Sequence, residues 1–136
     1  MQKTVTAADW EVGTTLRGEP RTVTRTDFVR YAGVSGDFNP MHHDEVKAKA
    51  AGEPSVFGHG MLSAGLLASA ITEAIGLAAL RSYRVRFRRP VRPDETLTPV
   101  LVVTAVSGAA VSLDCRLENE HGQVAVSGSA EVEVRP

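Results

Sequence analysis

Hydrophobic and polar residues alternate along much of the second half of the chain. Residues 83–88 alternate apolar side chains with arginines, and this period of two is typical of a strand with one buried face. The segment 96–106 is rich in valine, threonine and leucine, and residues 111–117 and 124–134 again carry apolar side chains at alternate positions. Because short turns connect these segments, the pattern predicts a mainly antiparallel sheet.

The segment Gly60–Ile75 is apolar on nearly every side of a helix. A helix without a polar face is buried all round, so we expect Met61 and the leucines after it in the core. With Thr72 and Glu73 it is too short and too polar to span a membrane, which takes about 20 apolar residues. A small domain buries such a helix by wrapping a sheet around it. The pattern therefore predicts an α+β hot-dog fold, an antiparallel sheet wrapped around a long buried central helix.

Two shorter helices are predicted in the first half of the chain. Thr24 and Asp27 have the spacing of a capping box, which opens the first helix. Glycines and a proline interrupt this helix between residues 33 and 40, because glycine favours turns and proline disfavours helix at the residue before it. Residues 44–51 predict a second short helix, with acidic residues at its start and a glycine as its stop.

The composition narrows the class of protein. A chain of 136 residues suits one domain, and we treat residues 1–136 as a single unit. The net charge of −1 argues against a general binder of nucleic acid or of membrane surfaces. One cysteine excludes an internal disulfide framework and fits a reducing compartment. Since the first ten residues carry no basic-then-apolar signal segment, we expect a cytoplasmic protein.

The stretch SGDFNPMHHD brings an acid and an imidazole, Asp37 and His42, into one short loop. Gly36 and Pro40 disfavour a helix there, so a fixed loop can turn both side chains toward one point. A carboxylate and an imidazole that share one water can act as general acid and base near neutral pH. Asn39 could hold the loop or the water through its amide. The alternative is a solvated turn, because Asp, Asn, Gly and Pro are common turn residues.

The same stretch resembles the MaoC-like family, which includes the (R)-specific enoyl-CoA hydratases and the (3R)-hydroxyacyl-thioester dehydratases. The resemblance rests on the blocks YAGVSGDFNPMHHD, FGHGMLSAG and YRVRFRRPVRPDETL, and extends from about residue 10 to near the C-terminus. The hydratase signature Gly-Asp-x-Asn-Pro-aliphatic-His is matched from Gly36 to His42. One departure is PDET at 93–96, where many relatives have Pro-Gly-Asp-Thr, and it affects a turn between strands.

The resemblance implies roles for four residues. It makes Asp37 and His42 the catalytic pair, and Asn39 and Gly60 substrate-binding residues. Asn39 matches the asparagine of the active-site loop, and the backbone N–H of Gly60 binds the thioester carbonyl. The position of Gly60 supports its role independently, because the first N–H groups of a helix lack internal partners and lie at its positive end. An enolate-like oxygen there would be stabilised without a metal.

The implied reaction is the reversible, stereospecific hydration of trans-2-enoyl thioesters to (R)-3-hydroxyacyl thioesters in fatty-acid metabolism, without a cofactor. The pair would hold one water, activate it for attack at C3 and deliver a proton to C2, with Asp37 as the principal base. The alternative is a non-catalytic subunit that binds thioesters or completes the pocket of a heterodimeric dehydratase. The acyl-chain length, the carrier (CoA or acyl carrier protein) and the physiological direction stay open.

Other side chains around the pair allow different chemistry. His43 is expected at the surface or behind the site, and His59 either shapes the turn before Gly60 or makes a structural hydrogen bond. Ser35 and Ser63 do not lie in Gly-x-Ser-x-Gly, which argues against a hydrolase. A metal is not expected, because the candidate ligands lack His-x-x-x-His spacing and a cysteine pair. Those candidates are Asp37, His42, His43, Asp44 and His59.

Three further features remain. Cys115 is expected in the core, and Tyr31 either packs there or lines the acyl pocket. A basic cluster could bind the phosphates of CoA or the acidic surface of an acyl carrier protein, or it forms a solvated strand face. Its members are Arg81, Arg84, Arg86, Arg88, Arg89 and Arg92. Because one sheet face and an edge need cover, we expect a homodimer, with a heterodimer of two hot-dog subunits as the alternative.

Overall fold

The computed structural model describes residues 10–76 and 79–134, and its strands form one antiparallel sheet, as predicted. The strands run in the order β1-β4-β5-β6-β3, and β2 pairs with another part of β4. They are β1 (Thr15–Arg17), β2 (Arg21–Thr22), β3 (Leu80–Phe87), β4 (Thr96–Ser107), β5 (Ala110–Glu118) and β6 (Val124–Glu133). The helices are α1 (Arg25–Ser35), the short 3₁₀ helix η2 (Pro40–His42), α2 (Glu45–Ala50) and α3 (Gly60–Ile75).

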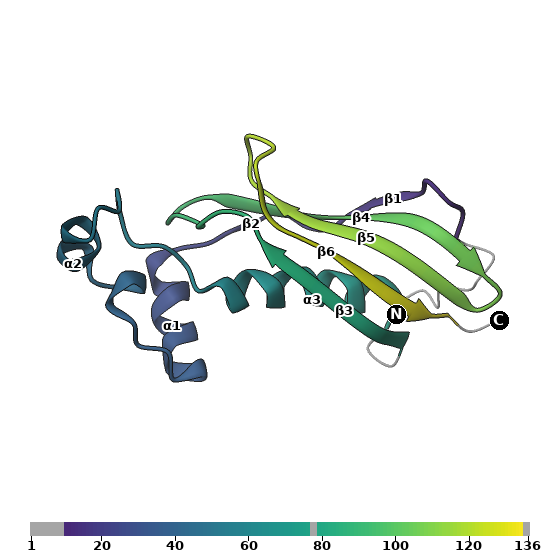
Figure 1. Ribbon diagram of the computed structural model, residues 1–136, viewed down its shortest axis with the longest axis horizontal. Helices are drawn as coiled ribbons and strands as arrows, with labels where there is room; N and C mark the ends of the chain where they lie inside the picture. Colours follow the sequence, from purple (N-terminus) through teal and green to yellow (C-terminus); the bar gives the residue numbers. More distant parts are fainter. Residues whose placement is uncertain (1–9, 77–78, 135–136) are drawn as a thin grey trace.

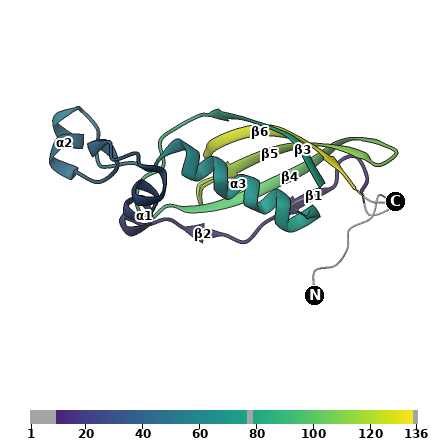
Figure 2. The same ribbon diagram turned by 90° about the horizontal axis from the view of Figure 1, so that it is seen from below.

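The long helix α3 lies across one face of the sheet, which confirms the predicted hot-dog arrangement (Figures 1 and 2). Leu67 and Ile71 are fully buried in the same core as Leu113 of β5. The hydroxyl of Tyr83 donates a hydrogen bond to the carbonyl of Ala64 at 2.7 Å, which ties β3 to the helix. Burial raises the pKa of Tyr83 above its ordinary value, so this hydroxyl keeps its proton. None of the described helices is long and apolar enough to cross a membrane.

One face of α3 is exposed, so the prediction that it is buried all round is wrong for the single chain. Met61, expected in the core, is 61% exposed. Gly65, Ser69 and Glu73 follow it at intervals of four residues and are also exposed. These intervals place all four residues on one side of the helix. A single sheet layer covers only the opposite side, where Leu67 lies.

The helices α1 and α2 lie beyond one end of the sheet (Figure 1). The predicted capping box is present: the Thr24 hydroxyl accepts from the N–H of Asp27, and the Asp27 carboxylate accepts from the N–H of Thr24. However, α1 continues through Gly33 and ends at Ser35. The helix ends there because Gly36, with a φ of 74°, adopts the left-handed conformation that a glycine tolerates best.

The strands β3 and β6 approach each other closely at Gly128. This residue pairs with Val85 in β3 and with Cys115 in β5. A Cβ atom on Gly128 would lie 2.1 Å from the carbonyl oxygen of Arg84. The pairing of β3 with the sheet therefore depends on the missing side chain at this position.

Candidate active site

The loop after α1 is fixed by a series of short-range hydrogen bonds. The Ser35 hydroxyl accepts from the N–H of Asp37 at 3.2 Å, and the Asp37 carboxylate accepts from the N–H of Asn39 at 3.2 Å. The amide oxygen of Asn39 then accepts from the N–H of Met41 at 3.1 Å and caps η2, whose first residue is Pro40. Asn39 therefore holds the loop, which is one of the two roles expected for it. The loop is a sequence of capped turns, and its residues 33–39 are exposed.

The structure brings together Asp37, at the beginning of this loop, and His42, at its end. The nearest atoms are His42 Nε2 and Asp37 Oδ2, 3.7 Å apart, which is too long for a direct hydrogen bond. His42 Nδ1 lies 2.7 Å from the carbonyl oxygen of Phe57. A carbonyl oxygen only accepts, so Nδ1 carries the proton, and the Nε2 of the neutral ring is a bare acceptor that faces the carboxylate. The side chain of His42 is 10% exposed and that of Asp37 is 53% exposed.

His59 connects both members of the pair. Its Nε2 lies 2.9 Å from the backbone carbonyl oxygen of Asp37 and therefore donates to it. Its ring stacks on the ring of His42, with centroids 3.8 Å apart and planes at 28°. On another side it contacts the ring of Tyr31, at 4.9 Å between centroids. Tyr31, which is partly exposed, thus packs against His59 and not in the main core.

The start of α3 completes the site next to His59. His59 is the N-cap residue, but its side chain makes no capping hydrogen bond. Among the described residues, neither Gly60 nor Met61 donates its backbone N–H to a protein acceptor. Gly60 is exposed, and the ring of Phe87 lies 3.0 Å from the position that a Cβ would take. The missing side chain leaves the first N–H groups of the helix open to a ligand at the positive end of the helix.

Asp37, His42 and His59 are also the one group of described residues whose ligand atoms lie close enough to hold a metal, within 4.8 Å of one another. Each imidazole already gives one nitrogen to a backbone carbonyl. Each ring therefore has one nitrogen left to accept a hydrogen bond or bind an ion. The carboxylate of Asp37 and Nε2 of His42 can also both accept from one water.

Comparison with known proteins places the chain in a family. Residues 7–123 match the family described as MaoC like domain. The chain belongs to the MaoC-like family. This MaoC-like chain is 31% identical over 117 residues to the (R)-specific enoyl-CoA hydratase of Rhodospirillum rubrum, covering 84% of this chain and 81% of that protein.

Solved structures share the fold of this MaoC-like chain over nearly its whole length. The unliganded R-hydratase PhaJ1 of Pseudomonas aeruginosa matches with a TM-score of 0.84 and 31% identity, covering 97% of this chain and 86% of that one. A chain of the ChsH1–ChsH2 complex of Mycobacterium tuberculosis matches with a TM-score of 0.81 and 27% identity, covering 92% of this chain and 98% of that one. The second structure is a complex between two differently named proteins.

The other candidate groups of the MaoC-like chain lie apart from this geometry. The hydroxyl of Ser35 donates to the carbonyl of Tyr31, and Ser63 is buried in α3. His43 is exposed, as expected. Cys115 is buried in β5, as expected, and burial raises the pKa of its thiol to about 11, which leaves it unreactive at neutral pH.

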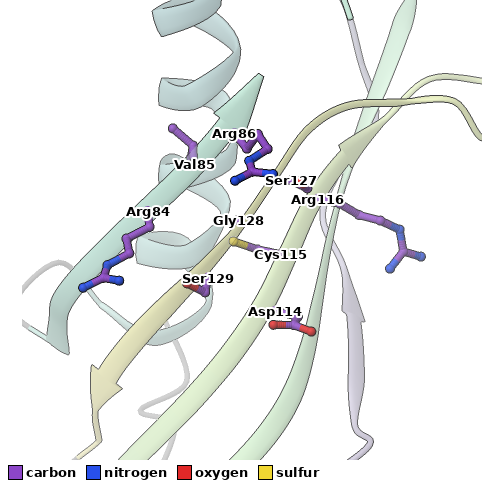
Figure 3. A pocket seen from close by; sticks show the side chains of 9 residues that line it. All are labelled: Arg84, Val85, Arg86, Asp114, Cys115, Arg116, Ser127, Gly128 and Ser129. Atoms are coloured by element: carbon purple, nitrogen blue, oxygen red, sulfur yellow. The ribbon is translucent and has the colours of Figure 1, made fainter. Parts of the chain in front are cut away.

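The basic cluster does not converge on one point. Arg89 and Arg92 form ion pairs with Glu95 and Glu53 at 2.5 and 2.6 Å, respectively. Two others, Arg84 and Arg86, line an open cavity of about 610 Å³ on the face of the sheet opposite α3, together with Arg116 (Figure 3). Figure 3 shows Arg84 and Arg116 extending away from each other, so they do not form a common binding site for one phosphate.

A second cavity, of about 340 Å³, lies beside the later turns of α3. Leu66, Ser69 and Glu73 line it from the helix, and Leu97 and Pro99 line it from β4. Neither this cavity nor the one on the outer face of the sheet is lined by the acid–histidine pair or by Gly60. At the pair itself, the carboxylate of Asp37 is half-exposed and the ring of His42 is largely buried.

Sequence reasoning missed two parts of the site. One is the carbonyl of Phe57, which sets the tautomer of His42, and the other is Phe87, whose ring lies beside Gly60. The block FGHG, which contains Phe57 and His59, gave an indication of the contact to the Phe57 carbonyl, because the backbone groups of a buried loop need hydrogen-bond partners. Nothing in the alternation of β3 indicates that its last apolar residue lies at the site, where it is 52% exposed.

Proposed function

We propose that this chain catalyses the reversible, stereospecific hydration of trans-2-enoyl thioesters to (R)-3-hydroxyacyl thioesters. One observation supports this above the others: the carboxylate of Asp37 and the bare Nε2 of His42 face each other at 3.7 Å. Both groups are hydrogen-bond acceptors, and a water molecule offers two donors. A water between them would have both protons fixed and its lone pairs free for attack.

The proton balance follows from the same arrangement. In hydration the water oxygen bonds to C3 while one of its protons passes to Asp37, and the other stays on oxygen, held by His42. Asp37 then delivers its proton to C2, so the carboxylate is regenerated and no cofactor or metal is consumed. The reverse sequence expels water from the (R)-3-hydroxyacyl thioester. Such positioned proton transfer contributes roughly 10²–10⁴-fold to a rate.

The start of α3 supplies the electrophilic part of the proposal. Proton transfer at C2 requires that negative charge develop on the thioester oxygen. The open N–H of Gly60, and that of Met61 beside it, can accept this charge at the helix N-terminus. His59, which precedes Gly60 and stacks on His42, brings this end of the helix next to the pair.

We also propose that two copies of this chain, each acting as one domain over residues 1–136, associate and enclose the acyl chain. Large apolar side chains around the site are exposed in the single chain. They are Val34, Phe38, Met61 and Phe87. Exposed apolar area of this kind marks an interface. The single cysteine fits the reducing cytoplasm, where we place the reaction.

The alternative is a non-catalytic unit that completes the pocket of a different hot-dog subunit. The match to a chain of the ChsH1–ChsH2 complex is the observation that favours this alternative. A subunit that only supports a partner has no need for a carboxylate and an imidazole with a fixed tautomer. The intact pair therefore favours an active enzyme.

The test is incubation of the purified protein with crotonyl-CoA, followed by chiral analysis of the product. We expect the (R)-3-hydroxybutyryl thioester, with its rate reduced on the order of 10²–10⁴-fold in Asp37→Asn and His42→Gln variants that stay folded. Formation of the (S)-alcohol, or full activity in both variants, would overturn the proposal. A lack of activity that returns when another hot-dog subunit is added would support the alternative.

A further inference from the structure

We propose that His59 is a positioning residue that sets both members of the acid–histidine pair, through a hydrogen bond to the backbone of Asp37 and through its ring face against His42. This inference rests on the function proposed above. It assigns to His59 no contact with the reacting atoms.

The first contact fixes the backbone of Asp37, from which the carboxylate extends. Apart from its approach to His42, the hydrogen bonds of Asp37 to its own loop join residues only two positions apart. The bond from His59 Nε2 to its carbonyl oxygen spans 22 positions and ties the loop to the start of α3. Among the described residues it is the one hydrogen bond that connects Asp37 to another part of the fold. Without it the capped loop keeps its shape but can shift as a unit.

The second contact fixes the direction of the imidazole. The ring of His42 has the face of His59 at 3.8 Å and the edge-on ring of Phe57 at 5.3 Å, with planes at 28° and 88°. The Nδ1 bond to the Phe57 carbonyl fixes one nitrogen, but a ring can still rock about that bond. The stacked face of His59 removes this freedom and keeps Nε2 aimed at the carboxylate.

One polar atom of His59 is buried at a cost in free energy, which indicates that the other contacts of this residue have a function. The residue is 3% exposed, and its Nδ1 has no hydrogen-bond partner among the described residues. A buried acceptor without a partner costs free energy. A phenylalanine would fill this position without that cost, but it could not donate to Asp37. The histidine therefore combines a donor and a flat ring in one side chain.

The experiment separates the two contacts with three variants. His59→Gln keeps an amide N–H near the position of Nε2 and loses the ring, and His59→Phe keeps the ring and loses the donor. His59→Ala loses both. With crotonyl-CoA we expect kcat to fall on the order of 100-fold in His59→Ala, with KM changed by less than about threefold, because a displaced pair slows the chemical step rather than binding. The Gln and Phe variants should each recover part of the lost kcat.

The matched control is His121→Gln, which changes an exposed histidine in the turn before β6 and should leave kcat and KM as they are. Ring ¹⁵N spectra of His42 provide a readout independent of activity. The wild type and His59→Phe, which keep a ring against His42, should show a proton on Nδ1. His59→Gln and His59→Ala should show an average over both ring nitrogens, because an imidazole that is free to rock no longer keeps its Nδ1–H on the Phe57 carbonyl. Thermal unfolding of each variant checks that it is folded, and the Gln and Phe variants carry the test where the Ala variant is not.

Two results would overturn the inference: kcat within about threefold of wild type in all folded variants, or losses confined to KM. If the wild type itself does not hydrate crotonyl-CoA, the proposed function fails, and the ¹⁵N spectra alone test whether His59 positions His42. An unchanged His42 pattern in a folded His59→Ala or His59→Gln protein would then count against His59. An averaged pattern would support it.

Discussion

The acid–histidine loop and the sheet are held in place in different ways. In the loop, the position of each functional side chain depends on one or two hydrogen bonds, such as those from His59 to Asp37 and from His42 to Phe57. In the sheet, β5 pairs with β4 on one side and with β6 on the other along its whole length, and its apolar residues are buried against α3. Substitutions in the loop should therefore change activity and leave stability nearly unchanged. Substitutions in the sheet should change stability and leave the activity of the folded protein nearly unchanged.

The largest expected effect is on the loop. Asp37→Asn should lower kcat on the order of 10²–10⁴-fold. The free energy of unfolding should change by less than about 0.5 kcal/mol, because the side chain is half-exposed and an amide oxygen can still accept from Asn39. Steady-state kinetics and chemical denaturation measure the two quantities. The same change at the exposed Asp114 of β5 is the control and should affect neither. A large loss of stability in Asp37→Asn would erase the distinction between the two regions.

The next effect is on the sheet. Gly128→Ala places a methyl group against the carbonyl of Arg84 and should destabilise the protein by about 3 kcal/mol, the upper end for overpacking. This lowers the unfolding midpoint by roughly 10 °C. The kcat of the folded fraction should stay near the wild-type value. Gly33→Ala, in α1 with open space around it, is the matched control and should stabilise the protein slightly. Equal melting temperatures for the two variants would contradict the close approach of β3 and β6.

The smallest expected effect is on an ion pair beside the strands. Burial acts to raise the pKa of Glu95, but hydrogen bonds from Arg89 and from the N–H of Arg92 outweigh it and hold the pKa below 4.5. A depressed carboxyl pKa in the folded state stabilises the protein above the unfolded pKa, and this contribution is lost as the pH falls through the folded value. Glu95→Gln should therefore lower stability at pH 7 by about 1–2 kcal/mol.

Stability measured between pH 6 and about pH 3 tests this prediction. The wild type should lose more stability than Glu95→Gln across the acid limb, so that the two curves converge at low pH. Parallel curves would show that the pair at Glu95 contributes nothing to acid sensitivity. Neither outcome changes the difference expected at pH 7 between the loop variants and the sheet variants.

Much of the fold follows from local pattern, because periodicity reports which side of an element is buried. The segment 111–117 alternates, and β5 buries those same apolar residues; the bounds predicted for α3 agree with the structure. The strands β1 and β2 carry no such signal, since they are three and two residues long. Met61 and Phe87 are apolar but exposed, which the local pattern does not predict.

The acid–histidine pair could also be predicted, because both residues lie in one short loop whose turn residues bring them together. The contribution of His59 could not. It depends on a contact between residues 22 positions apart and on the relative tilt of two rings. Neither quantity is encoded by spacing along the chain. The sequence suggested a shaping role for this residue without indicating what it contacts.

The burial of Cys115 has a practical consequence for studying assembly. The chain has one cysteine, and its thiol stays protonated at neutral pH because burial raises its pKa to about 11. A maleimide dye or spin label would therefore react with a cysteine introduced on the surface, for instance at His121, and ignore the native one. Distances between such probes in mixed populations would report how two copies are arranged, in the wild-type background.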